Sequence, residues 1–172
     1  FMPKIVDHAA QRETLVEGAF EFFADCGYAA LSMRGLASRL GVTTGVLYHY
    51  FDTKNSIFEQ ALLRSTERHI HAALETVDLK DSVPQRRRIL ADWVVEHQDD
   101  LKRTLLLALD AQRQAPDVQA VITQATQRFA NSLEEHIGMS RYAWPKLLGA
   151  LVSTQLSGEP LAQPALSALL ES

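Results

Sequence analysis

Apolar residues recur along the chain at steps of three and four, which is the spacing of one face of a helix. In the first segment this spacing joins Leu15, Ala19 and Phe23. Gly27 follows at a position where a left-handed residue favours the end of a helix. No segment alternates between apolar and polar residues for long enough to indicate a β-strand. The pattern therefore predicts an all-α fold.

The next part of the chain is expected to hold two short helices. Ser32 is placed to cap a helix over about residues 33–40, and Thr43 is placed to cap another over about 44–50. Gly41 stands between them, where a steep change of chain direction favours glycine. With the first helix, this arrangement is typical of a three-helix domain that contains a helix-turn-helix.

A long helix is expected to begin at Asp52 or Thr53 and to run to about Val77. Later helices are expected at about 84–98, 100–114, 116–137 and 144–157, with a final piece that reaches Leu170. This pattern predicts two domains, residues 1–52 with the helix-turn-helix and residues 53–172 as a second helical domain joined to it by the long helix.

Composition narrows the class of protein. The chain has 172 residues, of which 47% are apolar and 22% charged, and its net charge is −4. These values are typical of a globular protein and exclude a disordered one. A net negative charge argues against a protein that coats nucleic acid through charge alone. Positive charge is nevertheless concentrated locally. Residues 26–54 contain the basic residues Arg34, Arg39 and Lys54 but a single acidic residue, Asp52.

The sequence also predicts a cytoplasmic protein with no membrane partner. No apolar run approaches the roughly 18 residues that a membrane helix needs. Met2–Lys4 leads into polar residues, so no secretory signal segment is expected. The single cysteine, Cys26, cannot form an internal disulfide, and nothing in the pattern requires an oxidising compartment.

The sequence shows no motif that carries catalysis. It holds no glycine-rich phosphate loop, no zinc-type spacing of cysteine and histidine, and no nucleophile motif. His69 and His71 are two residues apart on a helix and point to roughly opposite faces, so they cannot share a metal. We therefore expect no catalytic residue, no metal, no cofactor and no enzymatic activity.

The helix-turn-helix offers side chains suited to DNA. Ser32 and Arg34 stand at a helix N-terminus, where backbone N–H groups and the helix dipole favour a phosphate. Thr43 and Thr44 begin the following helix and can reach base edges, and Gly45 permits a close approach of the backbone. Tyr48 and His49 suit phosphates or bases, and Lys54 suits a phosphate. Tyr50 suits the same role or packing against the first helix.

The string Gly45-x-x-Tyr48-His49-Tyr50-Phe51-x-x-Lys54, preceded by Ser32-Met33-Arg34, resembles the N-terminal domain of TetR-type bacterial transcriptional regulators. The resemblance covers about residues 9–55. It implies a homodimer that reads a palindromic operator on double-stranded DNA, followed by a helical domain that binds a small-molecule effector. The resemblance favours a repressor. The residues expected to contact DNA are Ser32, Met33, Arg34, Thr43, Thr44, Gly45, Tyr48, His49, Tyr50 and Lys54.

The second domain offers candidates for an effector pocket, which needs apolar walls and a few polar groups. They are Trp93, His97, Leu106, Asp110, Gln114, Phe129 and Trp144. Each also fits a place in the core or on the surface. Together they favour a hydrophobic or aromatic effector over a highly charged one.

Two further expectations concern assembly and the rival function. The helices at about 144–157 and 165–170 carry more apolar surface than one small subunit readily hides, which predicts a four-helix interface between two subunits. The residues concerned are Leu147, Leu148, Leu151, Val152, Leu156, Leu166, Leu169 and Leu170. The alternative function is a helical ligand carrier or enzyme in which the N-terminal helices form a structural cap.

Overall fold

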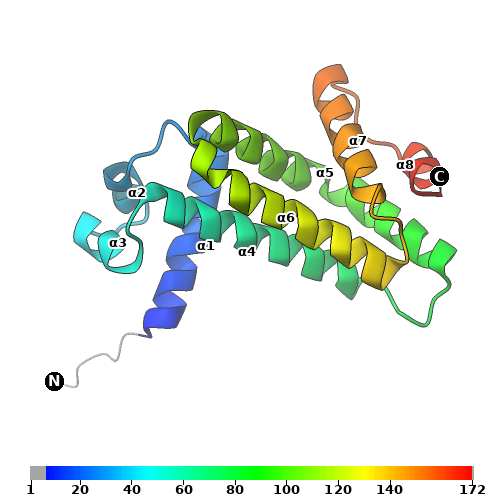
Figure 1. Ribbon diagram of the computed structural model, residues 1–172, viewed down its shortest axis with the longest axis horizontal. Helices are drawn as coiled ribbons and strands as arrows, with labels where there is room; N and C mark the ends of the chain where they lie inside the picture. The colour runs from blue at the N-terminus through cyan, green and yellow to red at the C-terminus, as the bar shows by residue number, and fades with distance from the viewer. Residues whose placement is uncertain (1–6, 172) are drawn as a thin grey trace. The chain divides into compact units, whose positions relative to one another are not determined.

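The computed structural model describes residues 7–171, so Met2–Lys4 lies outside it. Within this range every regular element is helical, which confirms the all-α fold (Figure 1). The elements are α1 (His8–Cys26), α2 (Met33–Arg39), α3 (Thr44–Tyr50), α4 (Lys54–Glu75), α5 (Val83–Gln114), η1 (Pro116–Val118), α6 (Gln119–Ser132), η2 (Leu133–Ile137), α7 (Ala143–Ser157) and α8 (Gln163–Glu171). None of the described helices is long and apolar enough to cross a membrane.

The described chain forms two compact units. Within the described residues, the first unit contains residues 7–65 and 107–121. The second unit contains residues 66–106 and 122–171. The unit that carries the helix-turn-helix thus includes the first half of α4 and a distant segment of the chain, both of which a division at residue 52 leaves out.

An aromatic cluster forms the centre of the first unit. The Phe23 ring on α1 stacks against Tyr28 at 5.8 Å between ring centroids, and the edge of Phe58 on α4 meets both rings at 5.6 and 5.2 Å. Leu36 on α2 and Leu47 on α3 are fully buried in the same unit. Such aromatic pairs stabilise a core beyond the area that they bury.

Gly27 ends α1 in a backbone conformation that side chains avoid. Its φ is 81°, as the sequence led us to expect, but its ψ is 156°, so it is not left-handed helical. This region of backbone space is essentially restricted to glycine. A Cβ atom at Gly27 would also lie 3.2 Å from Oδ2 of Asp110. The backbone conformation favours glycine there, and any larger residue would also require the Asp110 carboxylate to shift.

Helix α5 differs from the expectation of two helices over 84–98 and 100–114. It runs without interruption over Val83–Gln114, because no glycine or proline falls near residue 99. Asp99 is exposed, and its carboxylate lies 2.6 Å from Nζ of Lys102 one turn later. Thr104 donates its hydroxyl hydrogen bond back to the carbonyl of Asp100. The two aspartates therefore remain on the solvent side of a continuous helix.

The segment expected as one helix over 116–137 is also more varied. It begins with the 3-10 turn η1, continues as α6 and ends in the π-type turn η2. Gly138 then adopts the left-handed conformation, with φ 75° and ψ 35°. Such a wide last turn changes where the side chains of Leu133 and Ile137 point, and both are buried in the second unit.

Candidate DNA-binding surface and internal cavity

The turn between α2 and α3 is held by the backbone alone. Gly41 N donates to Ser38 O at 3.3 Å, and Val42 N donates to Ala37 O at 3.0 Å. This pair of bonds is a Schellman motif, which requires a left-handed residue at its centre. Gly41 supplies it with a φ of 69°, and nothing lies within 4 Å of the place where a Cβ atom would be. The glycine is there for its conformation and not for space.

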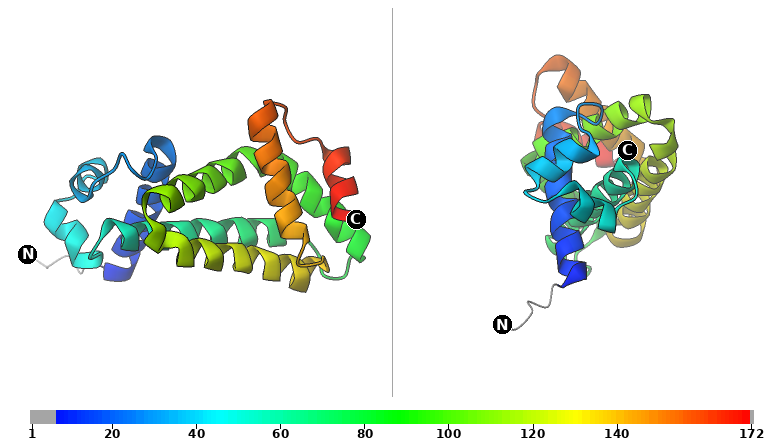
Figure 2. Two further views of the ribbon diagram at one scale, coloured as in Figure 1. Left: turned by 45° about the horizontal axis from the view of Figure 1, so that its top comes forward. Right: turned by 90° about the vertical axis from the view of Figure 1, so that its left-hand side faces the viewer.

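Both short helices are capped as the sequence predicts. Ser32 Oγ accepts a hydrogen bond from Gly35 N at 3.1 Å, and Thr43 Oγ1 accepts one from Val46 N at 3.2 Å. These bonds satisfy backbone donors that a helix start leaves free. The two helices lie side by side in both views (Figures 1 and 2). The cap residues therefore fix the orientation of α2 and α3 before any ligand is considered.

A polar face of the helix-turn-helix is open to solvent. Tyr48 is 52% exposed. The other candidate DNA contacts that are exposed are Ser32, Arg34, Thr43, Gly45 and His49, whereas Met33, Thr44, Tyr50 and Lys54 are half-buried. The face thus combines a cation at a helix N-terminus with hydroxyl and ring N–H groups, which are donors suited to phosphates and base edges.

Tyr50 joins α3 to α1. Its hydroxyl donates to Oε1 of Gln11 at 2.8 Å and lies 2.8 Å from Nδ1 of His8. The His8 ring also lies 5.7 Å from the ring of His49. Packing against α1, one of the two roles left open for Tyr50, is therefore observed. The sequence offered no signal for His8 and Gln11, because their partner is about forty residues away and they belong to no motif.

The side chain of Lys54 packs against Tyr28 within the first unit. Its Nζ donates to Tyr28 O at 3.0 Å and lies 4.0 Å from the centre of the Tyr28 ring. Desolvation lowers the pKa of Lys54, and the nearby charge of Asp110 opposes that shift. The ammonium group therefore ties the start of α4 to the loop that follows α1.

Asp110, expected to contact an effector, instead accepts a hydrogen bond in the first unit. Its Oδ2 accepts from Tyr28 N at 2.8 Å. Backbone N–H groups in a half-buried place need such a partner. Gln114, four residues later on α5, is exposed in the same unit. Neither residue lines the cavity described next.

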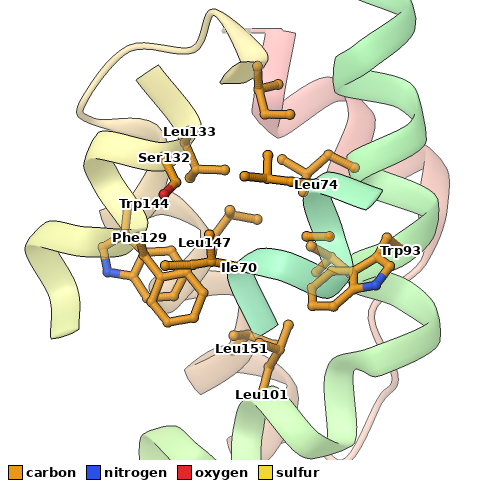
Figure 3. A pocket seen from close by; sticks show the side chains of 14 residues that line it. Ile70, Leu74, Trp93, Leu101, Phe129, Ser132, Leu133, Trp144, Leu147 and Leu151 are labelled. Atoms are coloured by element: carbon orange, nitrogen blue, oxygen red, sulfur yellow. The ribbon is translucent and has the colours of Figure 1, made fainter. Parts of the chain in front are cut away.

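The second unit contains a small apolar cavity (Figure 3). Trp93, Phe129 and Trp144 line it, as the sequence analysis expected for an effector pocket. His97 lies behind the wall, where its ring stacks on Trp93 at 4.4 Å. Leu106 is 42% exposed and does not reach the cavity. The remaining walls are mostly aliphatic, from residues such as Ile70, Leu90 and Leu151, which helical spacing marks only as core.

His69 packs on the outer side of the same wall. It is 5% exposed, its ring centroid lies 6.5 Å from that of Trp93, and Nδ1 has no hydrogen-bond partner among the described residues. Burial, together with smaller effects of Arg68 and His97 and against the opposing charge of Asp100, lowers the pKa of His69 from its usual 6.5 to about 4. His69 is therefore neutral in the folded protein at neutral pH. Within the described residues no cluster of histidine, cysteine, aspartate or glutamate is placed to hold a metal ion.

Comparison with known proteins supports the helix-turn-helix. Residues 15–61 match the family model of bacterial regulatory proteins, tetR family. The chain is 23% identical over 103 residues to the HTH-type transcriptional regulator PksA of Bacillus subtilis, which covers 59% of this chain and 50% of that protein. It is 36% identical over 69 residues to the HTH-type transcriptional repressor Rv1474c of Mycobacterium tuberculosis. This match covers 39% of this chain and 37% of that protein. The chain thus spans about half or less of the length of these curated relatives.

A solved structure extends the likeness to the whole fold. A tetR-family transcriptional regulator from Streptomyces coelicolor matches with a TM-score of 0.73 at 16% identity, over 96% of this chain and 79% of that chain. At this identity the likeness shows the fold alone. It nevertheless has the same plan, an N-terminal helix-turn-helix followed by a helical domain.

The contact of Asp110 with Tyr28 leads to a prediction on stability. Asp110→Ala leaves the Tyr28 N–H without its acceptor and is expected to lower the free energy of unfolding by about 1–3 kcal/mol. Asp110→Asn keeps an oxygen acceptor and should cost less. The exposed Asp99→Ala serves as the control, with an expected change within about 0.5 kcal/mol. Urea unfolding measures all of them, and equal values for the two alanine variants would contradict the role of Asp110.

The burial of His69 predicts a dependence of stability on pH. In the unfolded chain the pKa of His69 is near 6.5, whereas in the folded chain it is about 4. Stability should therefore fall as the pH drops through this interval, by up to about 3 kcal/mol. His69→Gln should flatten that slope, and the exposed His71→Gln should not. Denaturant unfolding at several pH values gives the measurement, and an unchanged slope in His69→Gln would refute the assignment.

Proposed function

We propose that this chain, whose N-terminal helix-turn-helix belongs to the TetR family, is a sequence-specific, DNA-binding transcriptional regulator. It acts as a homodimeric repressor in the cytoplasm and leaves a palindromic operator when a small-molecule effector binds. The observation that carries the proposal is the exposed polar face of α2 and α3, built on helices that are capped and tied to α1 by Tyr50.

Each residue of that face has a role that its chemistry suggests. Arg34, at the N-terminus of α2, pairs with a phosphate. The first residues of α3, Thr43 and Thr44, meet base edges in the major groove, and the exposed Gly45 leaves room for the DNA backbone. Tyr48 and His49 add phosphate or base contacts. Lys54 supports this face from within, because its ammonium group anchors α4 to Tyr28.

A second copy of the chain covers α7 in this proposal. The expected four-helix interface was based on eight apolar residues of the last two helices. Four of them, Leu147, Leu151, Leu166 and Leu170, are buried within the chain, where α7 and α8 pack on each other. Val152 and Leu156 remain 38% and 83% exposed on α7, and they follow the half-buried Leu148 at steps of four. Such a stripe suits a symmetric helix pair.

An effector changes DNA binding by favouring one conformation. It shifts the balance between states only by the difference of its affinities for them, typically about 1–3 kcal/mol of coupling. Helix α5 carries cavity residues such as Trp93 and Leu101 and, further along, Asp110, which holds the loop after α1. Helix α4 likewise runs from Lys54 to the cavity residue Leu74. These two helices are the proposed path of the signal.

Selection of bound DNA from a random pool tests the function. A recovered palindrome is expected, since a symmetric dimer reads two equal half-sites. On that sequence Arg34→Ala should weaken binding and reduce the slope of log affinity against log salt by about 0.9 per subunit. Arg88→Ala, an exposed arginine of the second unit, should leave both unchanged. If no sequence is enriched, the rival function of a helical ligand carrier or enzyme is favoured.

The assembly is tested on the exposed stripe of α7. Leu156→Glu combined with Val152→Glu should convert the dimer to a monomer, because two like charges then meet their copies across the symmetry axis. Leu79→Glu, at a position that is 64% exposed outside the stripe, is the matched control. Sedimentation velocity at micromolar concentration measures the state. A dimer that persists in the double variant would show that this face is not the interface.

A further inference from the structure

The apolar cavity adjoins a surface groove between α4 and α6. The groove is lined by Glu67, Ile70, His71, Leu74, Glu75, Arg128, Asn131 and Ser132. Three of these residues, Ile70, Leu74 and Ser132, also line the cavity. The same three side chains therefore separate the cavity from the groove. We call these three residues the partition.

The walls of the cavity offer no charge and almost no hydrogen bond. Ser132 is the single hydroxyl side chain among the described residues that line it. The nitrogen atoms of Trp93 and Trp144 lie at the outer edge of the group, and carbon atoms of the rings face inward (Figure 3). Phe129 stacks on Trp144 with ring centroids 4.2 Å apart and planes within 8°. A charged group inside would lose its hydration without compensation.

The cavity is small in this structure, with space for about two water molecules. An apolar cavity of about 150 Å³ engineered into another protein stays dry and binds benzene. A guest of that size or larger therefore needs part of the wall to move. The partition suits this role, because Ile70 and Leu74 lie about one turn apart on α4 and line both the cavity and the groove.

An ion pair crosses the groove beside the partition. Arg128 on α6 pairs with Glu67 on α4, and both side chains are partly exposed. Glu67 stands about one turn before Ile70, so the pair joins the two helices next to the place where they would separate. It contributes little to stability in water. It nevertheless restrains the two helices at this point.

We propose that the cavity binds small, uncharged, predominantly aromatic molecules, which enter between α4 and α6 through the partition while the Arg128–Glu67 pair restrains the opening. This inference rests on the proposed function, because it names the class of effector. It excludes organic ions as ligands of the cavity itself. The polar groups of the groove remain outside and contact only the end of a ligand that protrudes.

The chain reports occupancy through its own fluorescence. It contains two tryptophan residues, Trp93 and Trp144, and both line the cavity. The probe is N-phenyl-1-naphthylamine, which is neutral and accepts energy from excited tryptophan. Its matched control is 8-anilinonaphthalene-1-sulfonate, which has the same rings and one negative charge. Saturable quenching by the neutral probe is expected, with at least about tenfold weaker binding of the sulfonate. Equal binding of the two probes would overturn the assigned ligand class.

The entry route is tested on two neighbouring residues of α6. Ser132→Phe fills the partition and should slow association of the neutral probe at least about tenfold, as measured by stopped-flow. Asn131 lines the groove but not the cavity, so Asn131→Phe should leave the association rate of the probe unchanged. If Ser132→Phe does not fold, Ser132→Leu makes the same test with a smaller side chain. Arg128→Gln should speed association. Unchanged rates in the Ser132 and Arg128 variants would overturn the route.

These measurements use the protein without DNA, so their outcome is separate from that of the operator selection. If the probe binds as expected but no operator is recovered, the cavity stands and the proposed regulator does not. If an operator is recovered but the neutral probe does not bind in the cavity, the regulator stands and the ligand class is wrong.

Discussion

Tyr28 holds the first unit together, because its groups contact residues of α1, of the start of α4 and of the end of α5. Its N–H is bound by Asp110, its carbonyl by Lys54 and its hydroxyl by Asn55. Its ring fills the space between Phe23 and Phe58. Burial raises the pKa of the hydroxyl, and the charges of Asp117 and Glu59 raise it further. Since α1 ends just before this residue, the position of the whole helix-turn-helix within its unit depends on these contacts.

The helix-turn-helix shows how a surface for recognition is built on satisfied backbone groups. Ser32 and Thr43 use their side-chain oxygen atoms as caps, and Gly41 completes the turn, so that α2 and α3 are oriented by the chain itself. Tyr50 then fastens α3 to α1 through Gln11 and His8. Arg34 and Tyr48 remain exposed on this supported surface. Rigid support of this kind reduces the entropy that is lost when a ligand binds.

The second unit uses the same residues for its core and for its cavity. Trp93 and Trp144 are buried, and aromatic stacking with His97 and Phe129 holds each ring in place. The stacked rings and the aliphatic side chains around them line the cavity. Its apolar walls select against charge simply because they lack groups that could replace water. The neutral state of His69 behind Trp93 is a consequence of the same dry environment.

Interactions between near neighbours could be predicted from the sequence. The caps at Ser32 and Thr43, the turn at Gly41 and the bounds of α2 and α3 depend on groups within about five residues. The aromatic string through Phe51 lies in the segment that matches the tetR family model. Three residues that line the cavity, Trp93, Phe129 and Trp144, could be proposed from the sequence because large aromatic side chains are rare. The aliphatic walls were not, since Ile70 or Leu151 has the spacing of any core residue. The bonds of Asp110 to Tyr28 and of Tyr50 to His8 join residues 82 and 42 positions apart, and only the packing of the helices decided them. Periodicity states which face of a helix is buried, but it does not state which other helix will cover that face.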